Sequence, residues 1–458
     1  MVKRQGHLIR VLGRREVISL AFGAMIGWSW VALAGTWLES AGSFGSIVAF
    51  LVGGVVIAFI GMTYAELASA MPQVGGEHIY SLRAMGPGAS FVCTWSIIFG
   101  YFSVVAFEVV ALPTVTEYLF PNFKMGFLWT VAGYDVYLSW VLVGVAGSLV
   151  MTGINVIGIR TAAVLQTVVT LVILFAGVLV VSGALLNGSA ANMQPLSVDG
   201  LNGMLTVLVM VPFLLVGFDV IPQAAEEIDL PHREIGRVLV ISVIMAGAWY
   251  ALIVLGVSLS LDHEALGRAT LATADASAAS WRSPLIGKLV VVAGIAGILT
   301  SWNAFLVGGS RAIYALAHSG MLPRFLGRLH PRFNTPANAV VLVGALATFA
   351  PLLGRQTLVW LVDAGGFGIV IAYAMVALSF IILRRKQPEM PRPYRIRYGL
   401  FVGYTALVLA LGMIVLYLPG SPSALVWPYE WMILLGGTVT GAVFYVWARV
   451  FRGRPNSE

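Results

Sequence analysis

Long apolar runs, repeated along nearly the whole sequence, constrain the fold more than any other feature of this chain. A helix that crosses a lipid bilayer needs about 20 mostly apolar residues. Runs of this kind lie near residues 16–38, 43–71, 88–119, 137–155, 162–186, 204–225, 236–261, 286–317, 337–353, 358–383, 400–418 and 430–450. They do not show the ten-residue alternation of membrane β-strands. The sequence therefore predicts an all-α integral membrane protein with about twelve transmembrane helices.

The charged residues support this arrangement and suggest its orientation. With 59% hydrophobic and 10% charged residues, the chain has too little polar surface for a water-soluble globule. All but five of the 27 Lys and Arg residues fall in alternate loops and in the two tails, the exceptions being Lys124, Arg268, Arg282, Lys288 and Arg355. Positive loops stay in the cytoplasm, so we expect a multi-pass cell-membrane protein (inner or plasma membrane) with both termini cytoplasmic. This bias explains the net charge of +7 without a nucleic-acid partner.

An enzyme embedded in the membrane is the main alternative from another functional class. The single cysteine, Cys93, excludes an intrachain disulfide and a cysteine metal cluster. The six histidines lack metal-ligand spacing, and no nucleophile elbow or phosphate-binding loop is found. We therefore expect no catalytic residue, no metal and no cofactor.

Glycine interrupts two of the predicted spans where a helix should continue. The first span carries Gly23 and Gly27 near its middle, and the sixth carries Gly217 between Pro212 and Pro222. The two positions correspond if residues 16–186 (helices 1–5) and 204–383 (helices 6–10) form inverted repeats. Helices 11 and 12 then occupy 400–450, between cytoplasmic tails at 1–15 and 451–458. Broken helices bind substrates and ions through their exposed ends, whereas glycines that only allow close packing remain the alternative.

Four stretches resemble the amino acid, polyamine and organocation (APC) transporters of the LeuT-type fold. They are the broken first helix, residues 64–86 with Gly75-Gly76-Glu77, residues 217–235 and residues 310–336. The resemblance covers most of the chain, from residue 14 to about residue 397. It implies an amino acid permease that works by alternating access, with a central pocket between helices 1, 3, 6, 8 and 10.

The same resemblance assigns substrate contacts to single positions. In the first helix the family usually reads Gly-Ser-Gly-Ile-Phe, whereas this chain reads Gly27-Trp28-Ser29-Trp30-Val31. We expect the two tryptophans to narrow the approach to the backbone. The implied substrate-binding residues are Ile26, Gly27, Trp28, Ser29, Trp30, Glu108, Phe213, Val216, Gly217, Phe218, Asp219 and Phe305. For the phenylalanines, plain packing is the alternative.

Coupling to an ion cannot use the lysine that many proton-coupled members carry in helix 5, because Ile173 stands at the matching position. Glu108 is the best replacement, since an ionised carboxylate deep in an apolar span costs several kcal/mol unless it is neutralised, paired or hydrated. It could carry a proton or counter a substrate amine; a protonated glutamate that only bonds a neighbouring helix is the alternative. Asp219 is the second proton-coupling candidate. Thr300 and Ser301 are a possible sodium site.

The sequence thus predicts a secondary active transporter for a small amino acid or amine. Proton-coupled uptake is the first hypothesis, and exchange or sodium symport are the alternatives. The expected partners are the small-molecule substrate, the coupling ion and membrane lipid, and the sequence does not predict an oligomeric state.

Overall fold

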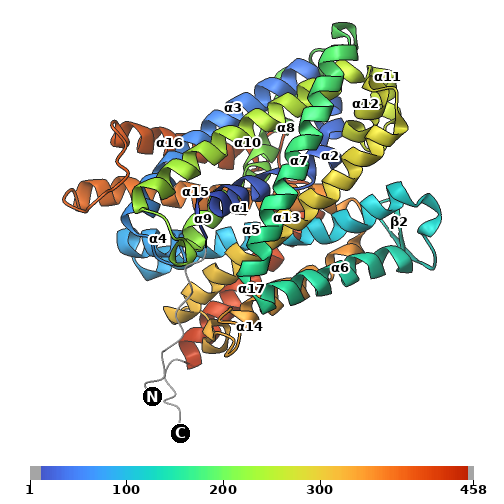
Figure 1. Ribbon diagram of the computed structural model, residues 1–458. Coiled ribbons are helices and arrows are strands. Elements are labelled where there is room, and N and C mark those ends of the chain that lie inside the picture. The colour runs from blue at the N-terminus through green and yellow to red at the C-terminus, as the bar shows by residue number, and fades with distance from the viewer. Residues whose placement is uncertain (1–11, 452–458) are drawn as a thin grey trace.

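The computed structural model describes the backbone of residues 12–451 and the side chains of residues 12–158 and 166–450, which form a single bundle of helices (Figure 1). Within this described part, nine helices are long and apolar enough to cross a membrane. They are α3 (Ala34–Ala70), α5 (Pro87–Leu119), α6 (Leu138–Ile157), α7 (Ile159–Asn187), α10 (His232–Ser260), α13 (Pro284–His318), α15 (Thr357–Lys386), α16 (Gly399–Leu416) and α17 (Tyr429–Phe451). The prediction of an all-α membrane protein is confirmed.

Three further predicted spans are shorter or interrupted. The first consists of α1 (Arg14–Ile26) and α2 (Ser29–Ala32), and the sixth of α8 (Gly200–Leu214) and α9 (Val220–Gln223). The ninth is α14 (Ala337–Ala347), extended by the 3₁₀ turn η5 (Ala350–Leu353). Both predicted helix breaks are therefore present, and the number of spans agrees with the sequence. The division into inverted repeats at 16–186 and 204–383 stays a prediction.

Several short elements connect the spans. They are α4 (Glu77–Met85), α11 (His263–Arg268), α12 (Ala272–Ser280), the strands β1 (Phe127–Val131) and β2 (Tyr134–Tyr137), and the 3₁₀ turns η1 (Pro121–Phe123), η2 (Ala190–Met193), η3 (Ala225–Glu227) and η4 (Arg324–Gly327). The strands pair as an antiparallel hairpin. This hairpin and α11 lie at one end of the bundle, and α4 lies at the other (Figure 1).

The helix α3 consists of two helices that meet at Gly42. This residue has a φ of 73° and a ψ of 177°, a conformation that glycine adopts without steric cost. The second span was predicted to begin at residue 43, and this is where the longer of the two helices begins after the break. The turns from Ala34 to Gly42 continue from the end of the first span.

The centre of the bundle is formed by α5, α13 and α15. In the most apolar window of α5 and of α13, 78% of the residues are buried, against 11% in α17. The helix α5 packs along α13 and α15, and α3 packs along α8 and α10. The interrupted helices α1 and α9 also contact α13. The two helix breaks therefore lie in the protein interior, while α17 presents most of its surface outward.

Candidate functional site

The break in the first helix is held open by side chains from other helices. Gly27 has φ 42° and ψ −141°, a combination that suits glycine alone. On one side of the break, the Tyr250 hydroxyl donates a hydrogen bond to the Met25 carbonyl at 2.8 Å and lies 2.7 Å from the Ser29 hydroxyl. Beyond it, the Thr273 hydroxyl donates to the Trp30 carbonyl at 2.6 Å. These bonds replace the helical bonds that the interrupted backbone lacks.

The second break contacts the first. Gly217, with a φ of 135°, lies so close to α1 that a Cβ atom there would approach the Ala24 Cβ to 2.7 Å and the Met25 amide nitrogen to 2.9 Å. The helix α13 is equally close on another side, because a Cβ at Gly297 would lie 1.9 Å from the Gly27 carbonyl oxygen. Glycine at these positions therefore lets three backbone segments meet.

Glu108 of α5 lies directly against the first break. Its side chain is buried, with 1% of its surface exposed. The Ser301 hydroxyl of α13 donates a hydrogen bond to Oε1, and the Trp28 backbone amide also faces the carboxyl group. The other oxygen, Oε2, has no hydrogen-bond partner. Within the described part of the chain, no cation forms an ion pair with this carboxyl group, so only a proton or a bound cation could neutralise it.

A small cavity lies where these segments meet. Its volume is about 10 Å³, close to the minimum that holds one water molecule. Its lining comprises Ala24, Met25, Gly27, Ser29, Val104, Phe107, Glu108, Phe213, Leu214, Ser301 and Phe305. The structure thus gathers Gly27, Ser29, Glu108, Phe213 and Phe305 from the predicted substrate site. The cavity is too small for an amino acid, so the helices must separate before a substrate can enter.

The two tryptophans do not line this cavity. The Trp28 indole lies against α13, where a Cβ at Gly294 would approach its Cδ1 and Nε1 to 2.8 Å. The Trp30 indole donates a hydrogen bond to the Gly27 carbonyl at 3.1 Å and packs edge-on against Trp249. The two indole rings therefore pack against α13 and Trp249, and neither ring lines the cavity. Ile26 is also buried outside the lining.

Part of the predicted site on the sixth helix lies away from the cavity. The Asp219 carboxylate accepts hydrogen bonds from the Gly217 amide at 2.8 Å and from the Tyr373 hydroxyl at 3.3 Å. Phe218 packs against Tyr64 and Tyr373, with ring centroids 5.3 and 5.4 Å away. Val216, Gly217, Phe218 and Asp219 therefore organise the break itself.

The two hydroxyls of the possible sodium site have different surroundings. Thr300 donates hydrogen bonds to the Gly23 carbonyl at 3.0 Å and to the Gly297 carbonyl at 2.9 Å. The Gln166 amide nitrogen lies beside the same segment and donates to the Thr300 carbonyl at 3.4 Å. Ser301 is bonded to Glu108. The Gln166 amide, a hydrogen-bond donor, thus lies beside the Thr300 and Gly23 oxygens that a cation would need as ligands.

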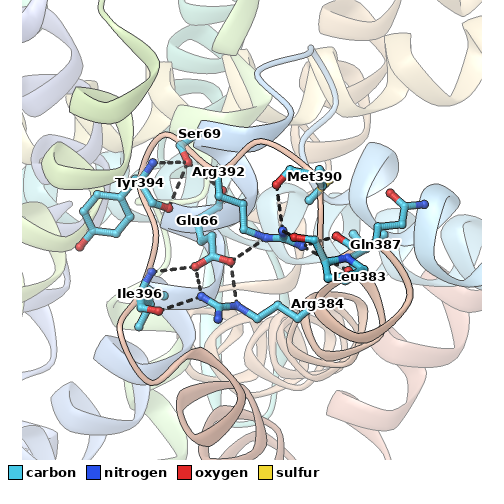
Figure 2. Close-up of polar contacts among 10 residues, drawn as sticks. Glu66, Ser69, Leu383, Arg384, Gln387, Met390, Arg392, Tyr394 and Ile396 are labelled. Atoms are coloured by element: carbon cyan, nitrogen blue, oxygen red, sulfur yellow. Dashed lines mark hydrogen bonds and ion pairs between the residues drawn. The ribbon is translucent and has the colours of Figure 1, made fainter.

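Two acidic residues near the helix ends, Glu66 and Glu227, form buried ion pairs. Figure 2 shows Glu66 of α3 between Arg384 and Arg392, with the Ile396 amide as a further donor. The Arg384 Nε atom lies 2.8 Å and the Arg392 Nε atom 3.1 Å from Glu66 Oε1. A second pair joins Glu227 to Arg311, at 2.8 Å, with both side chains 2% exposed. Their charges are therefore compensated within the protein.

Sequence reasoning missed several residues that shape the site, among them Met25, Phe107 and Tyr250. Met25 and Phe107 line the cavity, and Tyr250 supports the first break. A tyrosine in the middle of an apolar span is a usable signal, because a buried phenol needs a polar partner. Met25 and Phe107 carry no such signal, since both look like ordinary packing residues.

The architecture defines the class of protein. An all-helical membrane bundle in which two interrupted helices meet at a closed, partly polar cavity is typical of secondary transporters. No group of three or more His, Cys, Asp or Glu residues that could hold a metal ion occurs within residues 12–451.

Sequence comparison places the chain more narrowly. The family described as amino acid permease matches residues 12–443, so the chain belongs to the amino acid permeases, and it is a membrane transporter and not an enzyme. It is 24% identical over 408 residues to a branched-chain amino acid permease of Bacillus subtilis, covering 85% of this chain and 84% of the relative. A methylthioribose transporter of the same organism is 25% identical, covering 85% of each chain. Cationic amino acid transporter 4 of Mus musculus is 26% identical, covering 84% of this chain and 61% of the relative.

Proposed function

We propose that this protein takes up a small amino acid or amine by alternating access, coupled to proton entry, across the cell membrane with both termini in the cytoplasm. The observation that carries the proposal is Glu108, a buried carboxyl group beside the helix 1 break and in the wall of the cavity. Its partners are hydrogen-bond donors and not cations. Such a group changes its charge or binds a cation when its surroundings change.

The position of Glu108 links proton binding to substrate binding. An empty, closed cavity favours the protonated carboxyl group, because an unpaired charge in a low-dielectric interior is costly. When the helices separate, water reaches the carboxyl group and lowers the free-energy cost of its ionised form. A substrate ammonium group can then pair with the carboxylate, or the protonated group can bind a substrate carboxylate. The first arrangement exchanges a proton for the substrate. In the second, proton and substrate are bound together, so this is the arrangement that couples uptake to proton entry.

The surroundings of Glu108 connect its protonation with the binding of a substrate carboxylate. The Trp28 amide lies at the helix 1 break, where exposed amides would bind a substrate carboxylate, and it faces the Glu108 carboxyl group. Because two carboxylates at one position repel each other, a substrate carboxylate can bind here only when Glu108 is protonated. Relatives named as amino acid permeases support an amino acid substrate, but one relative is named for methylthioribose. We therefore keep both amino acids and amines as the substrate class.

Sodium coupling is less well supported. The Thr300 hydroxyl is already bonded to two carbonyl groups, and the Gln166 amide lies beside them. A sodium ion would have to displace these donors before it could bind the same oxygens. The addition of sodium should accordingly leave ligand affinity unchanged.

The first experiment is thermal stabilisation of the purified protein by a panel of amino acids and amines, at two pH values, with and without sodium. Compounds that raise the melting temperature are then tested for uptake into proteoliposomes under an inward proton gradient. Gradient-driven accumulation that is independent of sodium supports the proposal. Uptake that follows a sodium gradient but not a proton gradient contradicts it.

The variant Glu108→Gln tests the central residue. It keeps the size of the side chain but cannot bind or release a proton at this position, so binding should lose its pH dependence and gradient-driven accumulation should stop. The control is Glu39→Gln, because Glu39 is an exposed residue of α3. If Glu108→Gln leaves both binding and its pH dependence unchanged, the assigned role of Glu108 is wrong.

A further inference from the structure

A second group of buried polar side chains lies beside the helix 6 break, outside the cavity. Each of its members has 0% of its surface exposed. We call it the tyrosine–carboxyl cluster and define it as Tyr64, Glu77, Tyr80, Asp219, Gln223 and Tyr373. These residues come from α3, α4, α9, α15 and the break itself, so five segments of the chain meet at one polar centre.

The cluster connects Asp219 with Glu77. At one end, the Tyr373 hydroxyl donates to Asp219 at 3.3 Å. At the other end, the Gln223 amide donates to Glu77 Oε2. Tyr64 lies between the ends, with its ring centroid 5.7 Å from that of Tyr373 and 6.4 Å from that of Tyr80. The side chains of Tyr373 and Tyr64 therefore lie next to each other between the two carboxyl groups, and rotation of their hydroxyls must close the gap between them before a proton can pass.

Several atoms of the cluster have no hydrogen-bond partner although they are buried. They are Glu77 Oε1, Gln223 Oε1 and the hydroxyls of Tyr64 and Tyr80, joined by the neighbouring hydroxyl of Tyr101. Buried polar atoms nearly always have partners. The unpaired atoms around this carboxyl group therefore leave its hydrogen bonds incomplete in the present conformation.

Glu77 differs from two other buried glutamates at this end of the bundle. Glu66 and Glu227 are each paired with arginine, whereas no ion pair involves Glu77 in the described part of the chain. Burial and, next, the nearby Asp219 carboxyl group raise the pKa of Glu77 well above its usual value. The titratable groups that face it are Tyr64 of α3, Cys93 and Tyr101 of α5, Asp219, Tyr373 of α15 and Tyr80 of its own helix.

The placement of α4 makes Glu77 sensitive to movement of the sixth helix. A Cβ at Gly76 would lie 3.0 Å from the Pro222 Cβ, and one at Gly75 would lie 2.4 Å from the Ala315 Cβ. The start of α4 is therefore wedged between α9 and α13. Because Gln223 belongs to α9, any displacement of α9 breaks its hydrogen bond to Glu77 and changes the environment of this carboxyl group.

We propose that Glu77 is a second proton-binding site besides Glu108, and that it receives a proton from Asp219, at the neighbouring helix break, through the tyrosine–carboxyl cluster. In this step an O–H bond of the Asp219 carboxyl group breaks and an O–H bond forms on the Glu77 carboxylate. Each tyrosine on the path gives up one proton and accepts one, so it ends neutral. Glu77 then releases the proton at the α4 end of the bundle, which the charge distribution predicts to be cytoplasmic. The inference rests on the proton-coupled transport proposed above.

Two measurements on Glu77→Gln in the full-length protein test this site. In proteoliposomes, we expect loss of accumulation driven by a proton gradient, while exchange of labelled for unlabelled substrate at equal pH persists. By infrared spectroscopy, the C=O stretch of a protonated carboxyl group and its titration with pH should lose one component. Glu77→Asp should restore both signals, because it restores an ionisable group. The matched control is Glu226→Gln, because Glu226 lies nearby, is half-buried and accepts a hydrogen bond from the Val74 amide.

The outcomes separate the two proposals. If the wild-type protein shows no accumulation under a proton gradient, the proposed function fails, and the infrared titration still decides whether Glu77 binds a proton. If Glu77→Gln keeps both the gradient-driven accumulation and the complete carboxyl titration, the Glu77 site is wrong. Should Glu77→Gln not fold, Tyr64→Phe serves in its place, because it removes a hydroxyl from the path and should slow accumulation but not exchange. Equal rates of both processes in wild type and Tyr64→Phe would overturn the path.

Discussion

Glu66 and Glu108 are both glutamates within membrane-spanning helices, both 1% exposed, yet their surroundings are opposite. Glu66 accepts hydrogen bonds from Arg384 and the Ile396 amide and forms an ion pair with Arg392 (Figure 2). Glu108 has a serine hydroxyl and a backbone amide near it, and one of its oxygens has no partner. The first carboxylate is fully compensated in a single conformation, whereas the second can be compensated only by a proton or a bound cation.

The difference separates structural from functional acids. Arg384 and Arg392 also donate hydrogen bonds to carbonyl groups of residues 383–396, so Glu66 fastens the segment after α15 to the end of α3. The hydrogen bond between Ser301 and Glu108 does not hold a connecting segment in place in this way. Removal of Glu66 should therefore affect stability first, and removal of Glu108 should affect transport first.

The largest expected effect is that of Glu66→Gln on stability. The substitution leaves two arginines without their carboxylate partner, and breaking a buried ion pair from one side costs about 3–5 kcal/mol. We expect a large drop in the melting temperature of the purified protein in detergent, together with poor recovery of monodisperse material. Glu234→Gln is the control, because Glu234 pairs with two exposed arginines, Arg14 (59% exposed) and Arg237 (45% exposed), and ion pairs at the surface are worth about 0–1 kcal/mol. If the two variants are equally stable, the buried ion pairs of Glu66 do not contribute more to stability than the surface pairs of Glu234.

A medium effect is expected for Gly27→Ala, which tests whether Glu108 needs the space beside it. The residue has a φ of 42°, and the new Cβ would lie 3.1 Å from Glu108 Oε1 and 3.2 Å from the Ser301 Oγ atom. Backbone strain of this kind costs about 1–3 kcal/mol. We expect reduced thermal stability and a loss of substrate-dependent stabilisation in the same assay.

The control for this variant is Gly153→Ala in α6, where a Cβ would meet no atom within 4 Å. Alanine favours a helix over glycine, so Gly153→Ala should be neutral or slightly stabilising. Normal ligand-induced stabilisation in Gly27→Ala would show that the crowded break plays no part in binding.

Much of the fold could be predicted from the sequence because lipid imposes a simple rule. Every spanning segment must be a helix of a certain length, and the glycines and prolines at 23–27 and 212–222 mark where two of them break. The β1–β2 hairpin, α11 and α12 could not be predicted, because segments outside the membrane obey no such length rule. The start of the second span at residue 43 could be predicted, because Gly42 breaks α3 at this point.

The site was harder to predict because residue type does not reveal direction. Gly27, Ser29, Glu108, Phe213 and Phe305 meet at the cavity as the resemblance implied. Trp28 and Trp30 occupy adjacent turns but point to other helices. The sequence also gave no way to tell Glu66 from Glu108, because the partners of Glu66 lie more than three hundred positions away along the chain.

The smallest expected effect concerns His78, a buried base that, like Glu108, has hydroxyl partners. Its ring nitrogens lie 2.9 Å from the Ser90 hydroxyl and 2.6 Å from that of Ser319, and burial lowers its pKa to about 4. The folded protein therefore binds fewer protons than the unfolded chain, in which the pKa is about 6.5. Above about pH 6.5, the histidine is neutral in both states and does not change the free energy of unfolding. As the pH falls from about 6.5 toward about 4, the unfolded chain binds a proton that the folded protein does not, so the free energy of unfolding decreases progressively.

This dependence can be measured by comparing wild type with His78→Gln, which cannot titrate at this position. Between about pH 7.5 and about pH 5.5, wild type should lose about 1 kcal/mol more than the variant, which would appear as a steeper fall of its melting temperature. The control is His263→Gln, because His263 lies exposed at the start of α11. If wild type and His78→Gln lose stability in parallel, the expected low pKa is wrong. The buried imidazole would then be compensated by a nearby charge, as Glu66 is, and would not resemble Glu108.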